Sequence, residues 1–184
     1  MAITRGFRTD SSGVFITMTW AHVLAHKGEV FEVNDYDVDV DIAGPKYWHF
    51  KTADDDENAV HFRYDVTCNG GAMIEVFEDS TLSNDGTSLT IFNMNRQSTK
   101  TSSLLTAYYD PAVSSDGTRL TVHEIGSTGG GSRFAGTVPG FLGALEFILK
   151  SNTSYLIKVT VRQDDSTVGM NVFFYKYNYT DLTS

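Results

Sequence analysis

The three consecutive glycines Gly129–Gly131, followed by Ser132 and Arg133, are the residues that most resemble a chemical site. Glycine-rich loops bind phosphate when a helix N-terminus faces the anion and a Lys-Ser or Lys-Thr pair follows the glycines. Neither condition is met, because Pro139 and further glycines between residues 126 and 143 would weaken any helix there. The sequence therefore predicts a long loop between two strands, and such loops tend to be functional or disordered.

Two other segments contain potential metal ligands. His22 and His26 are four residues apart and would share one face of a helix, but Val23 stands where the zinc-protease pattern has glutamate. The run from Asp54 to Asn58 offers oxygen ligands for calcium, but it lacks the spacing and the glycine of an EF-hand loop. We therefore expect a solvated acidic loop, no metal site and no cofactor.

No arrangement of residues typical of covalent catalysis is evident. The chain has no Gly-x-Ser-x-Gly segment, and its single cysteine, Cys68, precedes the turn residues Asn69-Gly70-Gly71. His49, His61 and His123 fall within strand patterns and are interpreted as ordinary side chains of a sheet. A carboxylate pair for glycosidic cleavage stays open, because such pairs meet in space and not in sequence. We expect no catalytic residue and interpret the chain as non-enzymatic.

The elements that must position these groups are mostly strands. The segment Tyr36–Ile42 alternates apolar and acidic residues, which is typical of a half-buried strand, and places Asp37, Asp39 and Asp41 on a face open to solvent or to a partner. Further segments are rich in β-branched and aromatic residues, with turn residues between them. They are Tyr47–Lys51, Val60–Thr67, Met73–Glu78, Leu89–Asn93, Leu104–Tyr109, Arg119–Glu124, Glu146–Lys150, Tyr155–Arg162 and Val168–Tyr177.

This spacing of strands predicts the fold class. Strands of five to ten residues separated by turns indicate a single all-β domain, a sandwich or a barrel, rather than βαβ units. Only Trp20–Lys27 is expected to be helical. The first thirty residues differ from the rest and predict either a docking arm or a frayed terminus. Their basic and aromatic residues include Arg5, Phe7, Arg8 and Trp20.

Composition and charge exclude several classes of protein. The chain of 184 residues has 14 basic and 23 acidic side chains and a formal charge of −9, so a phosphate backbone would repel it. Its apolar runs are too short to span a bilayer, and the N-terminal residues lack the apolar segment of a secretory signal. One cysteine allows no intramolecular disulfide. We expect folding in a reducing cytoplasm and no nucleic-acid or membrane partner.

An ordered series of short motifs runs through residues 28–177. It comprises Ile74–Asp79, Gly86-Thr87, Phe92–Ser98, Gly117-Thr118, Gly129–Arg133, Glu146–Ile157 and the aromatic segment Phe173–Tyr177. The series resembles a family of tailed-bacteriophage virion proteins, the capsid decoration (cement) proteins. The chain departs from the family pattern at Met94, Ser151 and Phe174, where family members usually have Arg, Pro and Trp.

The resemblance implies a β-sandwich of the jelly-roll type, and the change in composition after residue 30 predicts an arm over residues 1–30 and the sandwich over 31–184. It also implies a structural role: binding to the major capsid protein on the outer surface of the head, as a dimer or trimer, in virions made in the bacterial cytoplasm. Gly129–Gly131 would let the backbone approach a neighbour, and Arg133 would donate to its carboxylates. The predicted partner contacts are Arg5, Phe7, Arg8, Trp20, Asn95, Arg96 and Arg133.

Two other functions stay open. One is a different virion component built on the same module, such as a tail or head-fibre attachment protein. The other is a carbohydrate-binding module, in which Trp20, Trp48 and several of the nine tyrosines would stack on sugars.

Overall fold

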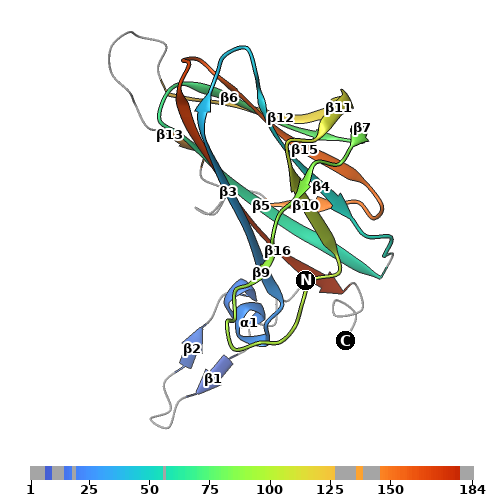
Figure 1. Ribbon diagram of the computed structural model, residues 1–184. Helices are drawn as coiled ribbons and strands as arrows, with labels where there is room; N and C mark the ends of the chain where they lie inside the picture. The colour runs from blue at the N-terminus through green and yellow to red at the C-terminus, as the bar shows by residue number, and fades with distance from the viewer. Residues whose placement is uncertain are drawn as a thin grey trace.

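Runs of β-branched and aromatic residues form two β-sheets that pack face to face (Figure 1). The computed structural model describes residues 7–9, 15–17, 20–55, 57–126, 136–138 and 146–178. The predicted all-β sandwich is confirmed, and so is the predicted helix, α1, which spans Trp20–Lys27. No helix among these residues is long and apolar enough to cross a lipid bilayer.

The first sheet has six strands in the order β12-β6-β15-β4-β10-β8, and all neighbours are antiparallel. In that order they span Thr118–Ile125, Ala72–Glu78, Ser154–Val161, Lys46–Thr52, Leu105–Tyr109 and Thr87–Ser88. A two-stranded ribbon of β7 (Thr81–Asn84) and β11 (Ala112–Ser115) lies beside it. The Lys158 ammonium of β15 donates to the Asp116 carboxylate just after β11, at 2.7 Å, and so ties the ribbon to the sheet.

The second sheet has the order β13-β5-β16-β3-β9, and β14 pairs with β5 as well. These strands span Gly136–Val138, Asn58–Cys68, Ser166–Asn178, Val30–Val40 and Phe92–Asn93, and β14 spans Phe147–Leu149. Two short strands near the N-terminus, β1 (Phe7–Thr9) and β2 (Phe15–Thr17), pair with each other. The long strands β3, β5 and β16 form most of the second sheet.

The core lies between the two sheets and is aromatic at its centre. Trp48 and Phe50 of β4 and Phe174 of β16 are fully buried, and Phe62 of β5 is almost so. The Phe50 and Phe62 rings meet edge to face across the sheets, with their centres 5.2 Å apart. Burying one such side chain contributes roughly 1.5–3 kcal/mol to the free energy of unfolding.

Helix α1 covers one end of the second sheet. Leu24 is 3% exposed and packs against Val30 of β3 and Tyr175 of β16. Val30 and Tyr175 lie on the side of the sheet that faces away from the core, so the helix closes this end of the outer face. The division into an arm, residues 1–30, and a sandwich, residues 31–184, stays a prediction, although α1 itself packs on the sandwich.

Strand β3 has the predicted alternation but the opposite orientation. Its apolar residues Tyr36 and Val38 are 75% and 51% exposed, whereas Asp35 and Asp37 face the first sheet. The Asp37 side chain keeps 40% of its exposure, so the predicted open face holds for it only in part, because the Lys46 ammonium of β4 donates to its carboxylate at 2.9 Å. Donors on the opposite sheet allow carboxylates to point inward, since buried charge is tolerated when it is paired.

Candidate functional site

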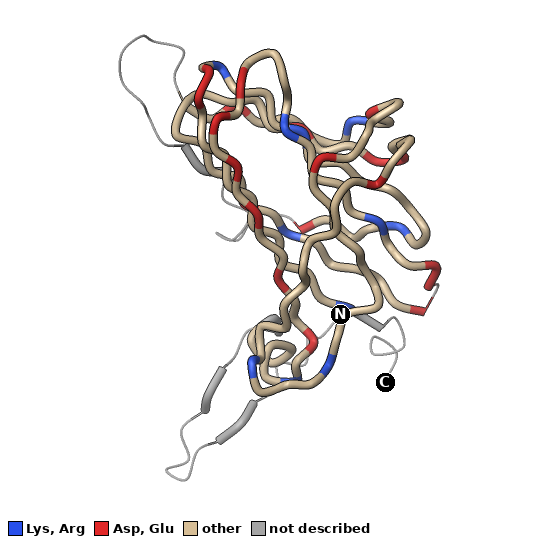
Figure 2. The backbone as a smooth tube through the Cα atoms, viewed as in Figure 1, with Lys and Arg blue, Asp and Glu red and all other residues tan. Residues whose placement is uncertain are grey.

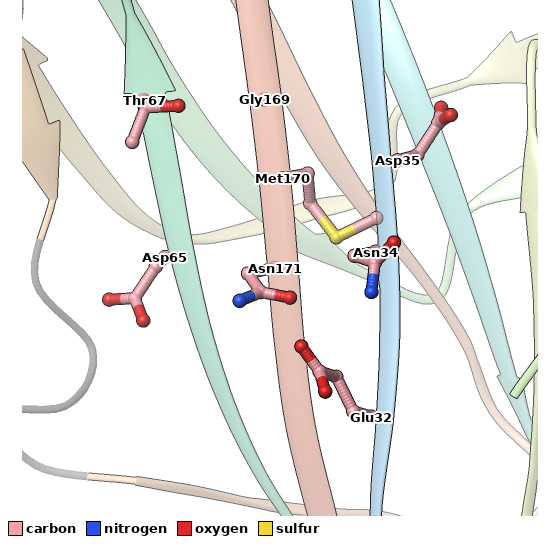
Figure 3. A pocket seen from close by; sticks show the side chains of 8 residues that line it. All are labelled: Glu32, Asn34, Asp35, Asp65, Thr67, Gly169, Met170 and Asn171. Atoms are coloured by element: carbon pink, nitrogen blue, oxygen red, sulfur yellow. The ribbon is translucent and has the colours of Figure 1, made fainter. Parts of the chain in front are cut away.

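A shallow hollow crosses the outer face of the second sheet, where β3, β16 and β5 lie side by side (Figure 3). We call it the trough; it has a volume of about 480 Å³. Asn171 pairs in register with Asn34 on one side and with Asp65 on the other, so their side chains share one face. The residues that line the trough are Glu32, Asn34, Asp35, Asp65, Thr67, Gly169, Met170 and Asn171.

Gly169 explains why the sheet is hollow at this point. It lies between Tyr36 and Thr67 in register, and a Cβ atom built on it would come within 2.8 Å of the Thr67 hydroxyl oxygen. Because no side chain rises from the middle strand here, the floor of the trough is backbone. The glycine therefore creates space on a surface that neighbouring side chains would otherwise fill.

The trough offers hydrogen-bond acceptors more than donors. Carboxylates of Glu32 and Asp65 lie on its two sides, and no basic residue lines it. The side-chain oxygen of Asn171 is buried and has no hydrogen-bond partner among the described residues. A buried acceptor without a donor is costly, so this group favours a ligand that brings an N–H or a cation.

Exposed apolar side chains flank the trough. Tyr36 and Val38 project from β3, and Phe92, which is 41% exposed, projects from the short neighbouring strand β9. Exposed apolar groups gathered in one place, with polar groups around them, mark surfaces that interact with other molecules. We call the trough together with Tyr36, Val38 and Phe92 the docking face.

Asn95 and Arg96 are the two predicted contact residues whose side chains the structure describes. The Asn95 amide donates to the backbone carbonyl of His26 at the end of α1, at 2.9 Å, so it bonds the body of the fold. Arg96 is exposed, and its guanidinium carbon lies 5.6 Å from the centre of the Phe92 ring, at one border of the docking face. Their roles as partner contacts stay predictions.

The other predicted contact residues lie in parts of the chain whose side chains the structure does not describe. Phe7 and Arg8 belong to β1, and Trp20 begins α1. Arg5, the glycines Gly129–Gly131 and Arg133 lie outside the described residues altogether. The prediction that the glycine loop and the arm contact a partner therefore stays open.

A half-buried carboxylate cluster lies at the edge of the same sheet, and the sequence did not indicate it. Glu146, just before β14, accepts from His61 Nδ1 at 2.8 Å, from Arg63 Nε at 3.0 Å and from the Tyr175 hydroxyl. Burial opposes ionisation of Glu146, but the hydrogen bonds from His61 and Tyr175 outweigh it and lower the pKa of this carboxyl. We call these four residues the Glu146 cluster; it joins the residue before β14 to strands β5 and β16.

A second polar arrangement lies on the outer face of the first sheet. His49 Nε2 is 2.6 Å from the Ser154 hydroxyl oxygen, and His49 Nδ1 is 3.6 Å from a carboxylate oxygen of Asp85. The order of groups is that of a nucleophile, a base and an orienting acid. However, His49 is fully buried and stacked against Tyr108, and the trough is not lined by any of the three. We interpret the arrangement as a structural contact.

The buried His49 predicts that acid destabilises the protein in the range where histidine titrates. Burial lowers the pKa of His49 below its ordinary value of about 6.5. The unfolded chain then takes up a proton before the folded chain does, so the free energy of unfolding falls as the pH drops below about 6.5. Urea denaturation at several pH values between about 7.5 and 5.5 measures the slope.

The His49→Gln variant is the control for this slope, because it retains a polar side chain but has no titrating ring. We expect its free energy of unfolding to change less with pH over the same range. An unchanged slope in the variant would assign the pH dependence to other groups and contradict this account of His49.

The two potential metal segments have other structural roles. His22 and His26 lie in contact on α1, with their Nε2 atoms 3.0 Å apart. Asp55 accepts from the Asn58 side-chain amide and from the Glu57 backbone, and the Asn58 hydrogen bond lowers the pKa of its carboxyl. Within the described ranges, no group of three or more ligating side chains could hold a metal ion. The Asp55 carboxylate thus holds Glu57 and Asn58 in place.

Trp48 does not have the exposure that sugar stacking requires. It is fully buried in the core, and its indole N–H donates to the Asp35 carboxylate at 2.8 Å. The hypothesis that Trp48 stacks on a carbohydrate is therefore wrong. Its ring faces the core because β4 turns alternate residues inward, and Trp48 shares that side with Phe50.

Comparison with known proteins gives no match to a family model, to a curated protein or to a solved structure. The resemblance to capsid decoration proteins therefore stays a prediction from the motifs in the sequence.

Proposed function

We propose that this chain is a non-enzymatic capsid decoration (cement) protein of a tailed bacteriophage, which binds the outer surface of the head and stabilises contacts between major capsid subunits. The observation that carries the proposal is the docking face, where exposed apolar side chains flank a trough of acceptors on a sheet of long strands. A protein that binds only the assembled head favours assembly by mass action. Such a role needs a stable surface and no catalytic centre.

The motifs behind the resemblance support a shared fold more than a shared contact. Ile74–Asp79 contains most of β6, and Glu146–Ile157 contains β14 and half of β15. Glu146 anchors the chain in its cluster. In another motif, Phe92–Ser98, the Asn93 amide donates to the Gly28 carbonyl at 3.0 Å. Residues of this kind keep an architecture in place, which is what a family of related sandwiches would have in common.

The jelly-roll topology is part of the proposal, and the strand order supports it. Successive strands β3, β4, β5 and β6 alternate between the two sheets. The late strand β15 then lies between β4 and β6, and β16 lies between β3 and β5. Late strands inserted between early ones in both sheets are expected when two Greek keys wrap into a sandwich.

The proposed partner is the major capsid protein, and the proposed state is a dimer or trimer on the outside of the virion. A tail or head-fibre attachment protein is the alternative within the same class. Carbohydrate binding stays a second candidate because of one observation: Tyr36, 75% exposed, stands beside the side-chain amides of Asn34 and Asn171. Aromatic rings beside amides and carboxylates suit sugar hydroxyls as well as protein.

Co-sedimentation of the purified protein with undecorated heads, with tails as a control, tests the proposal. Saturable binding to heads in a number that matches the capsid lattice is the expected result. Binding to tails alone would favour the attachment protein. Binding to neither would overturn the virion assignment, and a glycan array with loss of signal on Tyr36→Ala would then support the carbohydrate module.

A basic residue at Val38 is expected to weaken head binding about tenfold or more, because it replaces an apolar contact in the docking face. Val38→Arg is the variant, and its affinity for heads is the measurement. Val122→Arg on β12 of the other sheet is the matched control, since Val122 is 44% exposed and Val38 51%. An equal loss of affinity in both variants, or no loss in either, would contradict the assignment of the contact to this face.

A further inference from the structure

Strand β3 has an edge that the rest of the sheet leaves open. On that side it pairs with β9 only at Phe31 and Glu32, and Met94 N donates to the Val30 carbonyl at 2.9 Å. Among the described residues no strand continues along β3 from Val33 to Val40, and Figure 1 shows β9 beside only the part of β3 nearest α1. An unpaired edge presents a row of free N–H and C=O groups.

The pairing identifies which residues present these groups. Because the Val30 carbonyl points toward β9, alternate residues along the strand point the same way, so Asn34 and Tyr36 direct their backbone groups to the open edge. Val38 follows in the same alternation. The open edge ends at Asp39, whose φ of 61° and the register shift beside it form a bulge.

We infer that the edge from Asn34 to Val38 accepts an added strand from a partner protein, an extended segment whose outward side chains, at every second residue, are apolar opposite Tyr36 and Val38 and basic opposite Asn34. Backbone hydrogen bonds would supply affinity, and alternate side chains would supply specificity. Apolar residues of the added strand would lie beside Tyr36 and Val38. A long basic side chain opposite Asn34 would lie over the trough, where the Asn171 oxygen has no hydrogen-bond partner among the described residues.

Charge selects a basic occupant. Acidic residues recur along β3 and just beyond it, and Figure 2 shows them as red segments without blue between them. They are Glu32, Asp35, Asp37, Asp39 and Asp41, and the next basic residue, Lys46, already pairs with Asp37 and Asp110. Opposite charges on neighbouring strands stabilise their pairing.

A second copy of this chain is a poorer occupant. Two β3 edges paired antiparallel about Tyr36 would place Asp35 opposite Asp37 of the other copy, and like charges on facing strands destabilise pairing. Inward carboxylates also discourage an added strand when they lack partners. Here Asp35 bonds Trp48 and Asp37 bonds Lys46, so neither obstructs a partner that brings positive charge.

The inference rests on the proposed function only in taking the partner to be a protein, and its test does not require phage heads. The full chain is titrated with a labelled synthetic peptide whose outward positions, at every second residue, carry valine, valine and lysine, with threonine at the positions between them. The first control is the same peptide N-methylated along one edge, which removes its backbone donors; the second has glutamate in place of lysine. We expect binding of the lysine peptide and at least about tenfold weaker binding of both controls.

Variants of the edge locate the site. Tyr36→Pro removes an N–H that points away from β16, so the sheet keeps its bonds, and Tyr36→Ala is the matched control that removes only the ring. We expect about tenfold weaker peptide binding for the proline variant than for the alanine variant. Thermal melting shows whether each variant is folded.

Charge variants keep the test decisive if the proline variant does not fold. Glu32→Lys on β3 is expected to weaken binding of the lysine peptide. Glu57→Lys is the matched control, because Glu57 is an exposed residue just before β5. Equal effects of these two substitutions would overturn the inference, because attraction would then be non-specific. Unchanged affinity for the N-methylated peptide, or no binding of the lysine peptide, would overturn it as well.

The two proposals fail in different ways. If heads bind the wild-type chain and the lysine peptide does not, decoration stands and strand addition at β3 is overturned. If the peptide binds at the β3 edge and heads do not bind, the edge site stands and the decoration function is overturned.

Discussion

Replacing Trp48 with alanine is expected to lower the free energy of unfolding by about 3–5 kcal/mol, which is the range for truncating a buried aromatic side chain. Trp48 is fully buried between the sheets, so its removal leaves a cavity that the surrounding rings fill only in part. Its indole N–H also donates to Asp35, and that carboxylate would lose its donor. Urea denaturation followed by circular dichroism measures the change.

Tyr36→Ala is the control for Trp48→Ala, because Tyr36 is an aromatic residue of the same sandwich that is 75% exposed. Its truncation is expected to change the free energy of unfolding by no more than about 0.5 kcal/mol. Similar losses in the two variants would contradict the burial of Trp48. Normal stability of Trp48→Ala together with loss of sugar binding would instead restore the stacking role that the structure excludes.

The long strands were predictable because their side chains form long, regular patterns. Val60–Thr67 and Val168–Tyr177 were predicted from β-branched and aromatic residues, and they are the central strands β5 and β16. The ribbon strand β7, Thr81–Asn84, was not predicted, because its composition is that of a turn and it is defined by its pairing with β11. Leu89–Asn93 was predicted as a strand, but only Phe92–Asn93 pairs.

The sequence of β3 alone did not predict which of its two faces points toward the first sheet. An alternation of apolar and acidic residues indicates two faces and favours burial of the apolar one. In this protein Trp48 and Lys46 on the opposite sheet supply donors to Asp35 and Asp37, and the acidic face turns inward. The orientation thus depends on residues of another strand, whose position opposite β3 is set by the fold.

The trough was beyond prediction for a similar reason. Asn34, Asp65 and Asn171 come from three strands that are far apart in the sequence, and only the register of β3, β16 and β5 brings them together. One local signal was present: Gly169 interrupts an otherwise regular strand pattern, which marks a bulge or a place where something approaches the backbone closely. The Glu146 cluster likewise joins residues from three separate strand regions.

Replacing Glu146 with alanine is expected to lower the free energy of unfolding by about 2–4 kcal/mol, because three donors lose a shared and largely buried acceptor. Glu146 is 23% exposed, and its partners His61 and Arg63 are 14% and 27% exposed, so water replaces the lost bonds only in part. Tyr175→Phe removes one hydroxyl from the same cluster and is expected to cost about 1 kcal/mol. A double-mutant cycle with these two variants measures their coupling.

The pH dependence of Glu146→Gln separates the role of charge from that of packing. The folded state holds the pKa of Glu146 below its ordinary value of 4.5, so its contribution is complete above about pH 4.5 and is lost as the pH falls through the lowered pKa. The wild-type protein should therefore lose more stability than Glu146→Gln between about pH 5 and pH 3. Parallel curves for the two proteins would show that the carboxylate is not preferentially ionised in the folded state, and the cluster would then hold the chain by packing alone.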